Sequence, residues 1–290
     1  MRHWNFWALL AMLCGLTVGT CCHAKPKITT LPAISQWLVD YQKTSCVMVR
    51  RFGTSKRPVL LSMRTYGPGR DFEVTVAGEI AARLQQAPQF GIAYGLHELS
   101  FPSLHHNARA GAYGPAVLFS SALATRKHRQ VGGLAAEPMP DSDFEATVDR
   151  ISLATSHQTF VLDTGSVLPV LSALRTCTDA LVRNWGLDPA EQAELTRLPK
   201  VADKKWISEI LKDFPSELEY QGKDGRLNLR VMVDKAGQPT QCETVNAFRN
   251  ANFNTKVCDM VIGMARFEPA LDSNGQPVAS FFSGSIVYDN

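Results

Sequence analysis

The spacing of hydrophobic residues from about residue 40 predicts β-strands. In "DFEVTVAG" the apolar residues Phe72, Val74 and Val76 alternate with polar ones, so they share one face of a strand. The alternation in "FGIAYGL" runs as far as Leu96, and "SCVMVRRFG", "PVLLSMRTYG" and "PAVLFSS" are rich in β-forming residues. The stretch 126–142 contains Gly, Pro and mixed charges and is interpreted as a surface loop. This half of the chain is therefore expected to be rich in β-structure.

In the middle of the chain the hydrophobic period changes to that of helices. Apolar residues recur every three or four positions from Leu168 to Trp185, which places them on one helical face, and Gly186 ends the helix. A short second helix is expected in "DPAEQAELTRLP", with Asp188 as its N-cap and Pro199 at its end. Residues 200–205 are expected to form a linker between two domains.

The last part of the chain has the pattern of a small sheet with one helix. "GRLNLRVMVDKAGQPTQCETV" predicts a hairpin that turns at "DKAGQP", and "NFNTKVCDMVIGMARF" predicts a helix. A last strand is expected from about Val278, which gives the order ββαβ. The residues expected on one face of the first strand are Leu227, Leu229, Val231 and Val233. The residues expected on one side of the helix are Phe253, Val257, Val261 and Met264. The predicted fold class is α+β: a β-rich N-terminal domain with C-terminal helices, then a three-stranded antiparallel sheet with one packed helix.

The composition is that of a globular protein. Of 290 residues, 45% are hydrophobic and 20% are charged, which excludes a disordered or fibrous chain. The net charge of +3 is too small to indicate nucleic-acid binding, and the basic run "TRKHRQ" is interpreted as a solvated loop. We therefore expect no nucleic-acid partner.

The first 24 residues are interpreted as a secretory signal peptide. Arg2 and His3 precede an apolar run from Phe6 to Val18, and Cys22 and Ala24 offer small residues at the cleavage site. The run is shorter than the roughly 20 residues that a membrane-spanning helix needs. Export to the periplasm is the expectation. The alternative is a retained anchor in the inner membrane, with the rest of the chain facing the periplasm.

Four of the seven cysteines lie outside this leader: Cys46, Cys177, Cys242 and Cys258. An even number of cysteines in an exported chain predicts two disulfides. Four cysteines allow three pairings, and the local one, Cys46–Cys177 with Cys242–Cys258, keeps each bridge within one expected domain. The alternative is four buried thiols.

The stretch "TFVLDTGSVLPV" carries the Asp-Thr-Gly-Ser signature of aspartic proteases at residues 163–166. That chemistry needs two aspartates that face each other, so a chain with one copy could act only as a homodimer. The helical period that follows, with Pro169 in the first turn, favours a helix start at Asp163, Thr164 and Ser166 instead. We therefore expect a protein that is not an enzyme. The alternative is an exported enzyme or sensor whose activity lies in the N-terminal domain at Asp163.

The histidines and glycines do not form a recognised metal or nucleotide motif. His97, His105 and His106 lack the spacing of known metal ligands and are interpreted as surface histidines in a loop. The sequence contains no Gly-x-Ser-x-Gly motif and no phosphate-binding loop. No metal site and no cofactor are expected.

The C-terminal motifs resemble those of the TonB family of periplasmic energy transducers. "FPSEL" is similar to the family's Tyr-Pro entry segment, and "VDKAGQP" to its Val-Asp-x-x-Gly hairpin. "RFEPALDSNGQPV" matches the pattern Phe-x-Pro-Ala-x-x-x-x-Gly-x-Pro-Val. The expected organisation is a signal peptide at 1–24, a β-rich domain of unknown role at 26–187, a short helix and linker at 188–205, and a TonB-like domain at 206–290.

The resemblance implies a protein-binding module that serves transport across the cell envelope. In the family, the last strand of the domain pairs with an extended segment of an outer-membrane receptor, which is strand addition to a sheet edge. The partner here would be such a segment at the envelope or a second copy of the chain, and contact with a membrane would require a retained N-terminal segment. The residues expected on the binding strand are Val278, Ser280, Phe282, Ile286 and Tyr288.

Overall fold

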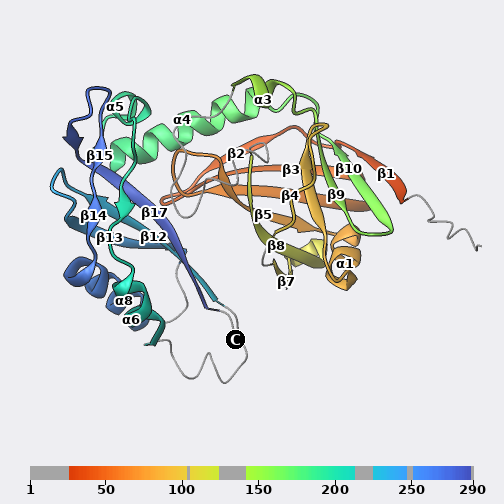
Figure 1. Cartoon of the computed structure of the whole chain (residues 1–290). Helices are drawn as coiled ribbons and strands as arrows, with labels where there is room; N and C mark the ends of the chain where they lie inside the picture. Colours follow the sequence, from red (N-terminus) through yellow and green to blue (C-terminus); the bar gives the residue numbers. More distant parts are fainter. Residues whose placement is uncertain (1–25, 103–104, 124–141, 213–224, 247–250, 289–290) are drawn as a thin grey trace, which may run out of the picture.

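Two separate clusters of buried side chains organise the chain. The computed structural model describes residues 26–102, 105–123, 142–212, 225–246 and 251–288 (Figure 1). The first cluster, called the first core, takes its residues from Cys46 to Leu181. The second cluster, called the second core, takes its residues from Trp206 to Ile286. Both contain helices and strands, so the fold class is α+β, as predicted.

The first core is built from two β-sheets. The larger sheet has the strand order β2-β3-β4-β5-β8-β7, and the smaller has the order β1-β10-β9-β6, in which β1 runs parallel to β10. The strands of the larger sheet are β2 (Leu38–Tyr41), β3 (Cys46–Thr54), β4 (Arg57–Thr65), β5 (Asp71–Ala77), β8 (Pro115–Ala122) and β7 (His105–Arg109). Those of the smaller sheet are β1 (Lys27–Pro32), β10 (Gln158–Asp163), β9 (Arg150–Ala154) and β6 (Gly91–Tyr94).

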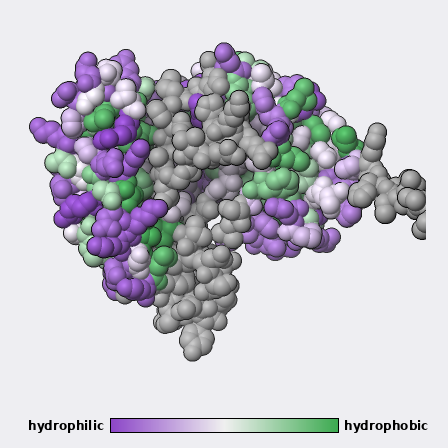
Figure 2. Space-filling model, viewed as in Figure 1, coloured by the Kyte–Doolittle hydropathy of each residue, from purple (hydrophilic) through white to green (hydrophobic). Residues whose placement is uncertain are grey.

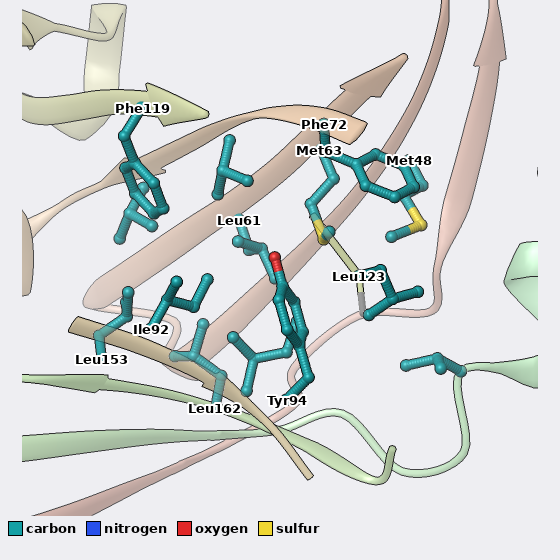
Figure 3. Close-up of a cluster of buried hydrophobic side chains, with 14 of the residues drawn as sticks. Met48, Leu61, Met63, Phe72, Ile92, Tyr94, Phe119, Leu123, Leu153 and Leu162 are labelled. Carbon is teal, nitrogen blue, oxygen red and sulfur yellow. The ribbon is translucent and has the colours of Figure 1, made fainter. Parts of the chain in front are cut away.

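Alternating side chains from the two sheets pack together in the first core (Figure 3). Phe72 of the larger sheet and Ile92 and Leu162 of the smaller sheet are all buried there. Burial of one such side chain contributes roughly 1.5–3 kcal/mol to folding. The buried Tyr94 hydroxyl donates a hydrogen bond to Ser121 Oγ at 2.9 Å, so the polar atom is satisfied inside the core.

The alternation predicted as far as Leu96 ends earlier than expected. Strand β6 stops at Tyr94, and Gly95 has a φ of 62°, a left-handed conformation that favours glycine. The chain turns there, and the Leu96 side chain is 88% exposed instead of buried.

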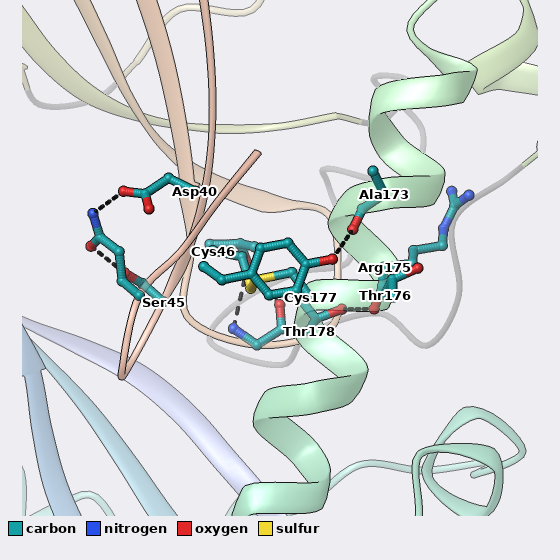
Figure 4. The surroundings of a disulfide bond; sticks show 12 residues. Asp40, Ser45, Cys46, Ala173, Arg175, Thr176, Cys177 and Thr178 are labelled. Atoms are coloured by element: carbon teal, nitrogen blue, oxygen red, sulfur yellow. Dashed lines mark hydrogen bonds between the residues drawn. A yellow bond between two sulfur atoms is a disulfide. The ribbon is translucent and has the colours of Figure 1, made fainter. Parts of the chain in front are cut away.

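Helices cover the open sides of the first core. They are α1 (Glu79–Gln86), α3 (Ser142–Ala146) and α4 (Leu168–Asn184), and a short 3₁₀ helix, η1, spans Gly111–Tyr113. Helix α4 runs along the top of Figure 1 from α3 to α5. A disulfide joins Cys177 on α4 to Cys46 on β3, and the Tyr41 hydroxyl donates to the Ala173 carbonyl beside it at 3.4 Å (Figure 4). The bridge ties the helix to the larger sheet.

The segment expected to be a linker begins with a short strand that pairs with a C-terminal strand. After α5 (Pro189–Ala193), strand β11 (Lys200–Val201) pairs antiparallel with β14 (Phe267–Glu268), and α6 (Lys205–Lys212) follows. Helix α5 begins as predicted, since Asp188 Oδ1 accepts a hydrogen bond from the Ala190 N–H at 2.9 Å. The sequence did not predict this pairing, because pairing with a strand far along the chain leaves no local hydrophobic pattern.

The second core lies between a three-stranded antiparallel sheet and two helices. The sheet has the order β13-β12-β17, and helices α6 and α8 pack against each other beside it. Its elements are β12 (Gly225–Val233), β13 (Pro239–Asn246), α8 (Ala251–Met264), β15 (Ala270–Leu271), β16 (Pro277–Val278) and β17 (Ser280–Tyr288). A second disulfide joins Cys242 on β13 to Cys258 on α8.

Two details of this region differ from the sequence predictions. Met264, expected on the buried side of α8, is 43% exposed, and Ala265 is buried in the second core instead. Val278 belongs to β16, where it pairs with Ala270, so the last strand begins at Ser280.

Among the described residues, no helix is both long and apolar enough to cross a membrane. The expected signal peptide lies outside the described residues, and so does the loop expected at 126–142 except for Ser142, which begins α3.

Candidate functional site

Strand β17 is the outer strand of the C-terminal sheet. It pairs with β12 over its whole length, from Ser280 opposite Val233 to Tyr288 opposite Gly225. Within the described part of the chain, no strand pairs with the other side of β17. An unpaired side of this kind presents main-chain N–H and C=O groups to which another strand can bond.

The direction of these main-chain groups follows from the hairpin turn. The Asp234 N–H donates to the Gln238 carbonyl at 3.0 Å, and the Asp234 carbonyl accepts from the Gly237 N–H at 3.0 Å. Even-numbered residues of β12 therefore direct their main-chain groups toward β13, and odd-numbered residues direct theirs toward β17.

The same alternation applies across the pair of β12 and β17, whose register is regular. Residues of β17 opposite even-numbered β12 residues form the pairs without hydrogen bonds, so their N–H and C=O groups point away from β12. These outward-directed residues are Phe281, Ser283, Ser285 and Val287.

The large side chains of β17 from Phe281 to Ile286 are buried, on both faces of the sheet. Phe282 and Ile286 are each 5% exposed and lie in the second core. On the opposite face, Phe281 is 6% exposed and its ring lies edge-on to Trp185, with centroids 4.9 Å apart. A partner could therefore reach this strand chiefly through its main chain.

The start of β17 is held by the short helix α5. Ser280 Oγ donates to Gln192 Oε1 at 2.6 Å, and Gln192 Nε2 donates to the Ala279 carbonyl at 3.2 Å. This end of the strand is therefore occupied by the protein itself, and the free edge begins after it.

The face of the sheet that lies opposite α8 meets Trp185, at the end of α4, and residues that follow β4, a contact called the junction. The Arg230 guanidinium lies 4.3 Å from the centroid of the Trp185 ring and forms an ion pair with Glu243. Burial lowers the pKa of Arg230, and the Glu243 charge opposes that shift. One Arg230 nitrogen, Nη1, is buried with no described hydrogen-bond partner, so contact with the ring replaces part of its lost hydration.

A hydrogen-bonded tyrosine lies at the same junction. The Tyr66 hydroxyl is hydrogen-bonded to Asn228 of β12 and lies 3.4 Å from Glu73 Oε2. Burial raises the pKa of Tyr66 well above its ordinary value, and the negative charge of Glu73 adds to the shift. Ser285 Oγ donates in turn to Asn228, which connects this group to β17.

Close packing at the junction depends on a residue without a side chain. A Cβ added at Gly67 would lie 3.2 Å from the Trp185 ring and 3.4 Å from the Phe281 ring. Sequence reasoning missed Gly67, Trp185 and Arg230 as members of one site, because contacts between distant segments leave no local pattern.

The Asp-Thr-Gly-Ser stretch lies between β10 and α4. Asp163 is the exposed last residue of β10, and its charge interacts with those of Arg50 and Arg150. Ser166 Oγ accepts a hydrogen bond of 3.4 Å from the Leu168 N–H at the start of α4. Asp163 does not line the cavity between α4 and α5, nor the one between α5 and the turn that joins β15 to β16.

The histidines occupy separate places rather than one site. His105 and His106 lie on strand β7, not in a loop as expected, and the His105 ring packs against Phe90. His97 Nε2 lies 2.9 Å from Thr147 Oγ1. In the described ranges, no group of three or more His, Cys, Asp or Glu residues is arranged to hold a metal ion.

Comparison with known proteins gives one match. No curated protein and no solved structure matches the chain. Residues 211–289 match the family model of the Gram-negative bacterial TonB protein C-terminal. This region includes β12, β13, α8 and β17, and its C-terminal motifs are therefore those of the TonB C-terminal family, as the resemblance predicted.

Proposed function

We propose that the protein binds an extended segment of a protein partner at the cell envelope by strand addition to β17. The observation that carries the proposal is the free edge of this strand, with outward main-chain groups at Ser283 and Ser285. The match of residues 211–289 to the TonB C-terminal family supports it, because that family works in envelope energy transduction without enzymatic chemistry. The periplasm is the compartment in which such a domain meets its partners.

The chemistry of the edge also supports main-chain recognition. The side chains expected to contact a partner, Phe282 and Ile286, are buried in the second core, and Ser280 is held by Gln192. Val278 pairs with Ala270 outside the strand. On the face drawn in Figure 2, hydrophobic residues form only scattered patches over the C-terminal elements. Strand addition needs no large apolar patch, since main-chain hydrogen bonds supply much of the affinity.

A proline at an outward position tests the proposal. Ser283→Pro removes an N–H that makes no bond to β12, and Ser283 Oγ is buried without a described hydrogen-bond partner, so little stability should be lost. Thr244→Pro is the matched control, because Thr244 lies opposite Leu229 on β13 and directs its N–H away from β12 at the other edge of the sheet.

The measurement is co-purification of envelope proteins with the full-length chain, combined with thermal unfolding. We expect both variants to unfold near the temperature of the original protein, and Ser283→Pro alone to weaken partner binding by about tenfold or more. Equal capture by the original protein and Ser283→Pro, or no captured partner at all, would contradict the proposal. A dimer that Ser283→Pro dissociates would identify a second copy as the bound strand.

A further inference from the structure

A cavity of about 450 Å³ lies between α4, α5 and the turn that joins β4 to β5. Its apolar lining includes Phe72, Leu123, Leu171, Leu174 and Phe281. The lining residues of α4 extend from Leu171 to Arg183, which corresponds to about 18 Å along the helix axis at 1.5 Å per residue. This size is within the range of sites for small molecules, and the shape is elongated.

Two oppositely charged residues of α4 line the cavity without pairing with each other. Asp179 and Arg183 are four residues apart, so they lie on one face of the helix with Cβ atoms roughly 5–6 Å apart. Residues of opposite charge at this spacing ordinarily form an ion pair. Here neither side chain makes an ion pair or hydrogen bond with any residue of the described ranges.

The other charged groups of the lining already have partners within the protein, and these include Arg70 of the turn between β4 and β5. Arg175 forms an ion pair with Glu145, whose side chain is 4% exposed. Asp188 Oδ1 accepts the hydrogen bond that begins α5. Asp179 and Arg183 are therefore the charged residues of the lining that are left without an ion pair or hydrogen bond in the described ranges: one carboxylate and one guanidinium, one helical turn apart.

We propose that this cavity binds a single-chain zwitterionic amphiphile. The apolar chain lies along Leu171 and Leu174, and the head group carries an ammonium that faces Asp179 and an anionic group that faces Arg183. The planar guanidinium is suited to bind a carboxylate or phosphate through two parallel hydrogen bonds. An uncharged head group would leave both side chains unpaired. A head group with a single positive or negative charge would pair with one of the two side chains and be repelled by the other, one helical turn away.

Calorimetric titration of the full-length protein with a matched series of dodecyl compounds, each below its micelle concentration, tests the proposal. The probes are dodecylphosphocholine, dodecanoate, dodecyltrimethylammonium and dodecyl maltoside, which share a chain and differ in head-group charge. We expect dodecylphosphocholine to bind at least about tenfold more tightly than the maltoside. A tenfold difference in affinity corresponds to about one additional charge-assisted hydrogen bond.

Two kinds of variant separate the chain from the head group. Ala193→Trp fills the cavity from the exposed side of α5 and should abolish binding of all four probes, whereas Ala173→Trp, on α4 outside the cavity, should not. Asp179→Asn and Arg183→Gln should each remove the preference for dodecylphosphocholine and keep the affinity for the maltoside. Lys56→Gln, an exposed charge in the turn between β3 and β4, is the control for net charge.

The outcomes are distinct. No binding of any probe, equal affinity for all four head groups, or unchanged binding in Ala193→Trp would each overturn the proposal. Because no protein partner takes part in the titration, its result is independent of strand addition at β17.

Discussion

Removal of the disulfide between Cys46 and Cys177 is expected to destabilise the protein more than removal of the one between Cys242 and Cys258. The first bridge closes a loop of 131 residues, and the second a loop of 16. In the chain-entropy model, the stabilisation grows with the logarithm of loop length, which gives about 5 kcal/mol for the first and about 3 kcal/mol for the second. The expected difference is therefore about 2 kcal/mol.

The measurement is urea denaturation of two double variants, Cys46→Ala/Cys177→Ala and Cys242→Ala/Cys258→Ala, followed by circular dichroism. Both variants lose the same sulfur atoms, so the comparison isolates loop length and burial. Cys46 and Cys177 are at most 1% exposed, whereas Cys242 and Cys258 are half-buried, so cavities left by alanine add to the same difference. An equal loss of unfolding free energy, or a larger loss in the second variant, would refute the reasoning.

Three further predictions concern the junction and the hairpin turn. The folded-state pKa of Tyr66 is raised, so the contribution of its neutral hydroxyl to the stability of the fold is fully present below about pH 10 and is lost as the pH rises further. The Tyr66→Phe variant should therefore show a smaller decline of melting temperature at alkaline pH than the original protein. A double-mutant cycle of Arg230→Met and Trp185→Leu should give a coupling of about 1–2 kcal/mol in urea unfolding, and zero coupling would exclude a stabilising contact. Gly237→Ala should destabilise the protein by more than about 1 kcal/mol, and by more than Gly275→Ala does. Both glycines have a positive φ, but only at Gly237 would a Cβ lie 2.0 Å from a main-chain oxygen. Equal losses of melting temperature in the two variants would contradict this.

Much of the fold could be predicted from local patterns. The alternation on β12 identified the four residues that lie in the second core, Leu227, Leu229, Val231 and Val233, because side-chain direction in a strand is a local property. The helical period also located α4, and Gly186, with a φ of 81°, follows its end. Once the register of β12 and β17 is known, the hydrogen bonds of the turn at Asp234 also determine which main-chain N–H and C=O groups of β17 point away from β12.

The remainder depends on which distant segments meet. Arg230 lies on the face of β12 opposite the second core, where alternation alone predicts solvent, yet it is 9% exposed against Trp185. Asp179 and Arg183 were part of a correctly predicted helix, but the cavity beside them requires the β4–β5 turn and Phe281 to lie nearby. Such contacts depend on tertiary packing and are not encoded in any single window of the sequence.

The pairing of β11 with β14 has a consequence for how the C-terminal region could be expressed as a fragment. A fragment cut at residue 211, where the family match begins, would lack β11 and most of α6. It would lose Trp206 and Ile210, which are 3% and 0% exposed in the second core, and each loss would cost about 2–5 kcal/mol. A stable fragment should therefore begin before Arg197, whose main chain bonds Leu271. The segment that folds as a unit is longer than the segment that the family match covers.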